Sequence, residues 1–197
     1  MVRFAILPCG ALDRAGSDIN GSVATGNPMD IEARLLRIKK TLLGKWFELL
    51  AGTYPLDTAR MLQKETGQFA NPVGHTFKVA LGEILDEFLG ENSAEAMAPL
   101  LDKVVRIRAV QDFSPSSSLA FIFGLKTLVR EFLKDELASG DVGDDELSGF
   151  DEKVDGLALF AFDVYMRCRE NLFEARIVEI KNRTQRLLQL ADKGREH

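Results

Sequence analysis

Histidine is nearly absent from this chain of 197 residues, which has only two, His75 and the last residue, His197. So few histidines exclude multi-histidine metal centres and most catalysis that relies on a histidine base. Cysteine is equally scarce, because Cys9 and Cys168 are the only two and lack the spacing of a metal motif. With no disulfide framework, the composition indicates a reducing compartment, and we expect a cytoplasmic protein.

An excess of positive charge is also missing. Lys and Arg total 25 against 30 Asp and Glu, which gives a formal net charge of -5 at pH 7. A nucleic-acid binder needs cations that neutralise phosphates, so we expect no nucleic-acid partner. No apolar run approaches the roughly 20 residues that span a bilayer, so we expect no membrane insertion. Hydrophobic residues still make up 46% of the chain, enough for the core of one domain.

The first 29 residues differ from the rest in composition. Glycine and proline interrupt this stretch repeatedly, and no 3.6-residue period runs through it. We expect residues 1–29 to form a flexible N-terminal extension, and Met29 is an alternative start of the protein. A helical domain is expected over residues 30–192, followed by a tail of residues 193–197.

From residue 30 onward, apolar residues recur at spacings of three and four, the pattern of amphipathic helices. Capping residues followed by proline mark several helix starts, as in Asn71-Pro72 and Ser114-Pro115. No segment has the alternation of a strand. The sequence therefore predicts an all-α protein, a bundle of about six helices with a long C-terminal helix. The predicted helices cover residues 30–50, 56–66, 73–89, 97–110, 116–137 and 145–190.

Few single side chains suggest chemistry. His75 lies one turn into a predicted helix, where a partly exposed histidine is expected and haem ligation is the alternative. Lys126 interrupts an apolar stripe, so it either reaches the polar edge of its helix or forms an ion pair. Lys103, Arg106 and Arg108 are expected on a solvated helix face, with an acidic partner or a phosphate as the alternative.

Clusters of hydroxyl and acidic residues also have ordinary structural explanations. The serine run 114–118 has no nearby histidine or basic residue that would activate a hydroxyl, and Ser114 is expected to cap a helix. The acidic stretch 140–146 lacks the alternating oxygen ligands of a calcium loop. We therefore predict no catalytic site, no metal site and no cofactor, and we expect a protein that is not an enzyme.

Several sequence blocks are more specific than these single residues. Together they resemble the N-terminal domain of the RsbT co-antagonist RsbRD, found in stressosome-type regulators and at the front of some sensor kinases. The resemblance covers about residues 31–190, and blocks 69–74 and 106–116 are its most specific parts. Trp46 and Phe69 are expected to be apolar anchors. In chain order, the blocks are Trp46-Phe47, Thr53-Tyr54-Pro55, Phe69-Ala70-Asn71-Pro72-Val73-Gly74, 106–116, Phe121-Ile122, Leu125-Lys126 and Phe162-Asp163-Val164-Tyr165.

The resemblance implies a signalling role. Related stressosome sensor domains have a dimeric, globin-like helical fold without haem, and a long C-terminal helix leads into an output domain. Since this chain stops at His197, we expect it to lack its own output domain and to act on an unidentified protein partner. It would then be a dimeric sensor or adaptor. A small-ligand-binding helical protein with an apolar pocket is the alternative function.

The end of the long helix carries a candidate interface. Its residues follow the a/d spacing of a heptad repeat: Phe173, Ile177, Ile180, Thr184, Leu187 and Ala191. An upstream stripe on a different face is expected to line the core: Phe150, Val154, Leu157, Ala161, Tyr165 and Cys168. An apolar seam needs a covering partner, so we predict a homodimer through it, with continuation of the bundle core as the alternative.

Overall fold

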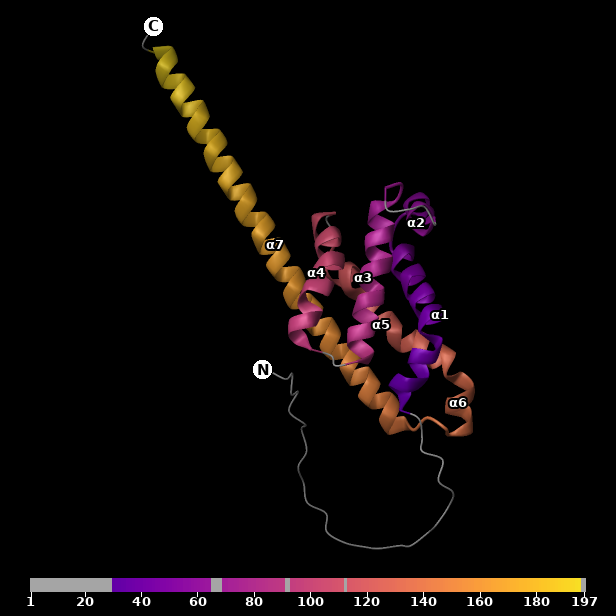
Figure 1. The fold of residues 1–197 in the computed structure, drawn as a ribbon. Helices are drawn as coiled ribbons and strands as arrows, with labels where there is room; N and C mark the ends of the chain where they lie inside the picture. Colours follow the sequence, from indigo (N-terminus) through magenta and orange to yellow (C-terminus); the bar gives the residue numbers. More distant parts are fainter. Residues whose placement is uncertain (1–29, 65–68, 91–92, 112, 196–197) are drawn as a thin grey trace, which may run out of the picture.

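The computed structural model describes residues 30–64, 69–90, 93–111 and 113–195, with side chains as far as Gln189. All regular structure in these ranges is helical, as predicted (Figure 1). The predicted extension over residues 1–29 lies outside the described residues, and the domain boundaries and the globin-like arrangement stay predictions. The helices are α1 (Ile31–Gly52), α2 (Leu56–Gln63), α3 (Pro72–Leu89), α4 (Ala94–Val110), α5 (Pro115–Phe132), α6 (Lys134–Ser139) and α7 (Asp144–Arg195).

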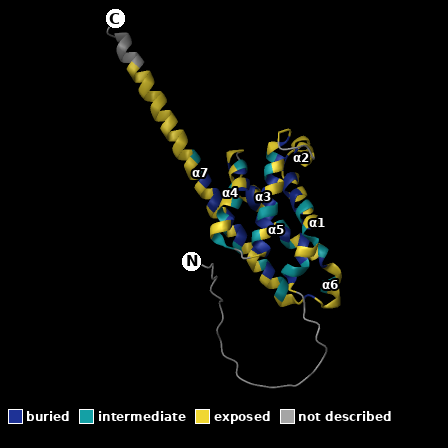
Figure 2. Cartoon of the chain, in the orientation of Figure 1, coloured by how far each residue is buried: buried dark blue, intermediate teal, exposed yellow. Residues whose placement is uncertain are grey.

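The bundle is built around α1, α3, α4, α5 and the first half of α7. Helix α1 packs against α3 and α5, while α4 and α5 pack against α7. Trp46 lies in this core with no exposed surface, and its indole nitrogen donates to the carbonyl of Phe121 at 2.8 Å. The ring centroids of Trp46 and Phe121 are 5.7 Å apart. The prediction that Trp46 anchors the core is confirmed, and Figure 2 shows the buried faces of these helices turned inward.

Helix α4 begins three residues before its predicted start. Ser93 caps it, because its hydroxyl accepts a hydrogen bond from the amide of Ala96 at 3.4 Å. Pro99 lies inside the helix, near enough to its start that it removes only one early hydrogen bond. Ser114 caps α5 as predicted, accepting from the amide of Ser117 at 3.2 Å.

One predicted helix, over residues 116–137, is wrong as a single element. The chain bends at Leu133 and forms α5 and the short α6, so the described residues contain seven helices instead of about six. Leu133 is buried, whereas α6 has no buried residue, so the bend keeps Leu133 in the core while α6 runs over the surface. Gly140 ends α6 with a φ of 79°, a conformation that glycine adopts without strain.

Block 69–74 joins α2 to α3 through Asn71 instead of Phe69. The prediction that Phe69 is an apolar anchor is wrong, because its side chain is fully exposed in the turn before α3. Asn71 is buried, and its amide nitrogen donates to the carbonyls of Met61 at 3.0 Å and Leu62 at 2.9 Å. Its oxygen accepts from the amide of Gly74 at 3.0 Å. One side chain therefore caps the end of α2 and the start of α3.

Candidate functional site

Helix α7 lies half inside the body and half outside it. Its predicted core stripe is buried throughout: Phe150, Val154, Leu157, Ala161, Tyr165 and Cys168. From Phe173 to Gln189 every residue is exposed (Figure 2). At about 1.5 Å per residue, the part of α7 beyond Cys168 projects about 40 Å from the body (Figure 1). The prediction that the upstream stripe lines the core is confirmed, and the stripe ends at Cys168.

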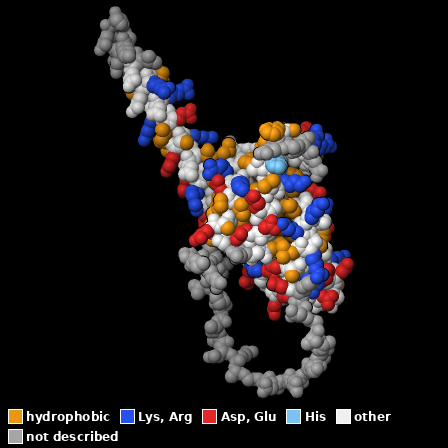
Figure 3. All heavy atoms as spheres, viewed as in Figure 1, with side chains coloured by type: hydrophobic (Ala, Val, Ile, Leu, Met, Phe, Trp, Pro, Cys, Tyr) orange, Lys and Arg blue, Asp and Glu red, His pale blue; other side chains and the backbone are white. Residues whose placement is uncertain are grey.

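The predicted interface residues lie on this projecting part. Phe173 and Ile180 are 66% and 64% exposed, and Ile177 and Leu187 are 42% and 60% exposed. Thr184 is also exposed, and its hydroxyl donates to the carbonyl of Ile180 at 2.9 Å within its own helix. The hydroxyl therefore needs no partner across an interface. Figure 3 shows hydrophobic side chains between charged ones along this helix, so the seam is not part of this chain's own core.

The apolar stripe begins closer to the body than the sequence analysis predicted. Residues 157–162 are all apolar, yet Phe162 is 43% exposed and Leu159 is 70% exposed. Only one face of α7 contacts the bundle here. Five apolar residues recur at intervals of seven and are all exposed: Leu159, Met166, Phe173, Ile180 and Leu187. We call these five residues the α7 stripe. The sequence analysis found the heptad spacing from Phe173 onward and missed Leu159 and Met166, which extend it toward the body.

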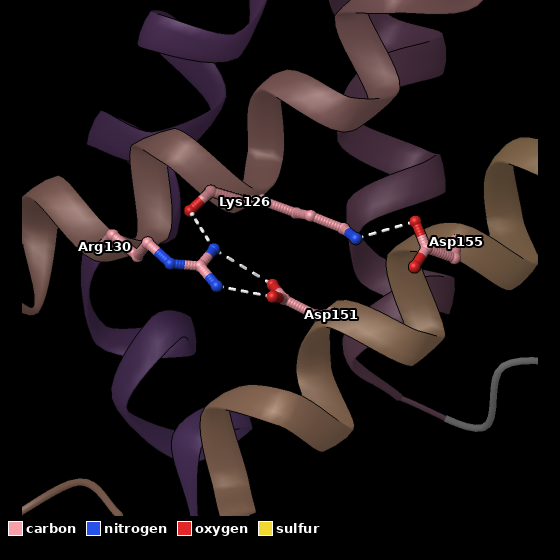
Figure 4. Close-up of polar contacts among 4 residues, drawn as sticks. All are labelled: Lys126, Arg130, Asp151 and Asp155. Carbon is pink, nitrogen blue, oxygen red and sulfur yellow. Dashed lines mark hydrogen bonds and ion pairs between the residues drawn. The ribbon is translucent and has the colours of Figure 1, made fainter. Parts of the chain in front are cut away.

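Two ion pairs fix the first half of α7 against α5 (Figure 4). The ammonium nitrogen of Lys126 lies 2.7 Å from a carboxylate oxygen of Asp155. Arg130 pairs with both oxygens of Asp151, one of them at 3.0 Å, and also donates to the carbonyl of Lys126 at 3.1 Å. Of the two interpretations of Lys126, the ion pair is the one present. Such exposed pairs contribute about 0–1 kcal/mol each, so they set the register of the two helices more than their stability.

Three further hydrogen bonds hold α7 at the point where it leaves the body. The phenol of Tyr165 donates to the carbonyl of Phe113 at 2.6 Å, just after α4. The guanidinium of Arg169 donates to the carbonyl of Ala109 at 3.1 Å. The thiol of Cys168 donates to a carboxylate oxygen of Asp102 at 3.3 Å. These bonds attach α7, where it leaves the body, to the C-terminal half of α4 and to Phe113 in the α4–α5 connection.

Arg108 lies beside this attachment, and its predicted place on a solvated face is wrong. Its side chain has no exposed surface, although Lys103 and Arg106 on the same helix are exposed, as predicted. One guanidinium nitrogen, Nη2, donates to the hydroxyl of Thr53 at 2.9 Å and to the carbonyl of Ser117 at 2.7 Å. No described residue accepts a hydrogen bond from the other two nitrogens, Nε and Nη1.

Aromatic rings surround the Arg108 guanidinium. Its central carbon lies 4.3 Å from the ring centre of Phe113, 5.2 Å from Tyr54 and 5.9 Å from Phe121. These are cation–π distances. We call Arg108 and its three rings the arginine cage. It joins the end of α1, the end of α4 and the start of α5.

Burial shifts the pKa values of three groups in this region. It lowers the pKa of the Arg108 guanidinium from its ordinary value, while Tyr54 acts in the opposite direction, and Arg108 stays a cation at neutral pH. Burial also raises the pKa of the Tyr54 phenol above 10.0. For the Cys168 thiol, burial and the hydrogen bond to Asp102 raise the pKa to about 11. Cys168 is therefore a protonated, weakly reactive thiol.

The other candidate residues lie on the surface. His75 is exposed near the start of α3, as expected. The ammonium nitrogen of Lys103 lies 2.6 Å from Glu83, and the guanidinium of Arg106 lies 2.8 Å from Asp102. Within the described ranges, no three His, Cys, Asp or Glu side chains are grouped as a metal would need. None of the described helices is long and apolar enough to cross a membrane.

Comparison with known proteins agrees with the predicted resemblance. An uncharacterised protein of Archaeoglobus fulgidus is 30% identical over 117 residues, which are 55% of this chain and 73% of that protein. No solved structure matches the chain. The model of the RsbT co-antagonist protein rsbRD N-terminal domain matches residues 40–180, from the middle of α1 to the projecting part of α7. The chain therefore belongs to this family of stressosome-type regulatory domains.

Proposed function

We propose that this protein is a non-catalytic signalling module of the cytoplasm that works as a homodimer. Its helical body senses a signal or a partner, and α7 transmits the state of the body to a protein partner that carries the output. The α7 stripe is the single observation that carries this proposal. Soluble monomers seldom leave contiguous apolar patches exposed, and patches that persist commonly mark interaction sites.

The spacing of the α7 stripe favours a second copy of this chain as the occupant. An interval of seven keeps the residues on one side of a helix, and two such helices bury them against each other in a coiled coil. A parallel, two-fold pairing would place each stripe residue opposite its own copy. Both projecting helices would then point away from the two bodies in the same direction.

The energetic balance favours a reversible dimer. Burying a large aliphatic or aromatic side chain contributes at least about 1.5 kcal/mol. The stripe side chains are 39–70% exposed, so ten of them in two copies would contribute about 8–15 kcal/mol, against an association cost of about 4–15 kcal/mol. Because the two quantities are similar, the loss of one stripe position is sufficient to separate the copies.

The test is an Ile180→Lys substitution, followed by sedimentation equilibrium and thermal unfolding. Removing two buried isoleucines costs about 3 kcal/mol, and burying an unpaired charge adds to this loss. We expect dimer affinity to fall at least about 100-fold while the body still unfolds cooperatively. Val178→Lys is the matched control, since Val178 is 56% exposed on the same helix but lies about 200° round it from Ile180.

Val178→Lys should leave the dimer intact. A wild-type chain that stays monomeric at all accessible concentrations would contradict the proposal. So would an Ile180→Lys variant that remains dimeric. If that variant instead lost its cooperative unfolding, the stripe would belong to the stability of the body.

A further inference from the structure

The arginine cage contains hydrogen-bond donors that no described residue satisfies. Arg108 has no exposed surface, and its Nε and Nη1 donate to no described residue. The third buried side-chain atom of this kind among the described residues is the hydroxyl of Ser118. Ser118 follows Ser117, whose carbonyl accepts a hydrogen bond from Arg108. Leaving a buried donor unsatisfied is destabilising, and more so when the donor is charged, so these atoms require an explanation.

The charge of the cage is also unbalanced. No carboxylate of a described residue pairs with Arg108, whose hydrogen bonds to Thr53 and Ser117 end at a hydroxyl and a carbonyl. One buried cation calls for one negative charge, because a divalent anion would leave an excess negative charge in the interior. The lining of Tyr54, Phe113 and Phe121 is aromatic, which suits an apolar body and not a strongly hydrated ion.

From these observations we propose that the arginine cage binds a small organic monocarboxylate, which accepts hydrogen bonds from Arg108 while its apolar part packs against the rings. Phe113 is the only partly exposed ring of the three, since Tyr54 and Phe121 are buried. It is also the ring nearest to the guanidinium, at 4.3 Å. The ligand reaches Arg108 by displacing Phe113.

The cage is connected to α7 through the same residue. The carbonyl of Phe113 accepts the hydrogen bond of Tyr165, and the carbonyl of Ala109, next to Arg108, accepts that of Arg169. A displacement of Phe113 therefore acts on the bonds that hold α7 where it leaves the body. This consequence for α7 rests on the proposed function, whereas the binding step does not.

The test measures thermal unfolding of the full chain in sodium benzoate, with sodium chloride at equal ionic strength as the reference. For the wild type we expect a saturable rise in Tm of about 5–10 °C at a benzoate concentration 100-fold above Kd. Arg108→Met removes the cation and keeps much of the volume, so its Tm should not depend on benzoate. Arg106→Met is the matched control and should respond like the wild type, because Arg106 is exposed on the same helix.

Three results would overturn the proposal. The first is a wild-type Tm that is the same in benzoate and chloride. The second is an equal rise in Arg108→Met, which would show a general salt effect. The third concerns Asp112, four residues after Arg108 and outside the described residues. If its carboxylate neutralises Arg108, the wild type will not respond and Asp112→Asn will. The Tm of the Ile180→Lys variant should rise in benzoate too. Failure of the proposed dimer, measured by sedimentation, is therefore distinguishable from failure of the proposed site, measured by the benzoate-dependent Tm.

Discussion

Asn71 offers the sharpest test of how the helices are connected. In Asn71→Ala the α3 cap is lost, at a cost of about 1 kcal/mol. The carbonyls of Met61 and Leu62 also lose their donor, and each lost hydrogen bond costs about 0.5–1.5 kcal/mol. The sum is about 2–4 kcal/mol. For a domain of this size the change corresponds to a fall in Tm of roughly 4–16 °C.

Two variants separate the contributions of the two caps. Asn71→Ser keeps an oxygen for the α3 cap but loses the donors to α2, so its stability should lie between those of the wild type and Asn71→Ala. Ser93→Ala removes only an N-cap, and urea unfolding should show a loss of about 1 kcal/mol or less. If Asn71→Ala is no more destabilising than Ser93→Ala, the reasoning about a shared cap is wrong.

Three further predictions concern single positions. Gly74→Ala should destabilise the fold by several degrees in Tm, because a Cβ there would lie 2.4 Å from the carbonyl oxygen of Leu62; an unchanged Tm would contradict this packing. Without ligand, the free energy of unfolding of Arg108→Met should be no more than about 1 kcal/mol below that of the wild type, because an apolar chain replaces a buried, unpaired cation. A larger loss in urea unfolding would contradict this. The folded-state pKa of Cys168 is raised from 9.0 to about 11. The contribution of this thiol to the free energy of unfolding is therefore complete below pH 9 and is lost between pH 9 and 11. In a Cys9→Ser background the wild-type thiol should also react slowly with a disulfide reagent at pH 8, and Cys168→Ser should reduce the loss of stability between pH 9 and 11.

The helices and the change of face on α7 follow directly from the sequence. Spacings of three and four give the helical period. On α7 the core-facing residues end at Cys168, while apolar residues on another face continue to Leu187. Local helix signals do not show where a continuous helix bends. Leu133 is followed by residues that favour a helix, and only its burial in the core explains the separation of α5 from α6.

The same helical periodicity could have predicted that Arg108 is buried. Leu101, Val104 and Val105 are buried, and Arg108 follows them on the same face of α4. We expected Arg108 to be exposed because it is charged, and charged side chains usually lie in solvent. The rings that compensate part of the cost come from the turn after α1, the α4–α5 connection and α5, and no local pattern reveals that they meet. Phe69 shows the opposite error, since an aromatic residue in a turn has no helix face that carries it inward.

The most direct test of the proposed parallel dimer is disulfide cross-linking of identical positions. In a Cys9→Ser, Cys168→Ser background, Leu187→Cys places a thiol in the α7 stripe, and Val178→Cys places one on the same helix outside it. A parallel pairing brings the two copies of position 187 together. We predict rapid, nearly complete dimer formation by Leu187→Cys on mild oxidation, and little by Val178→Cys. Equal cross-linking of both variants, or none by Leu187→Cys, would contradict a dimer through the α7 stripe.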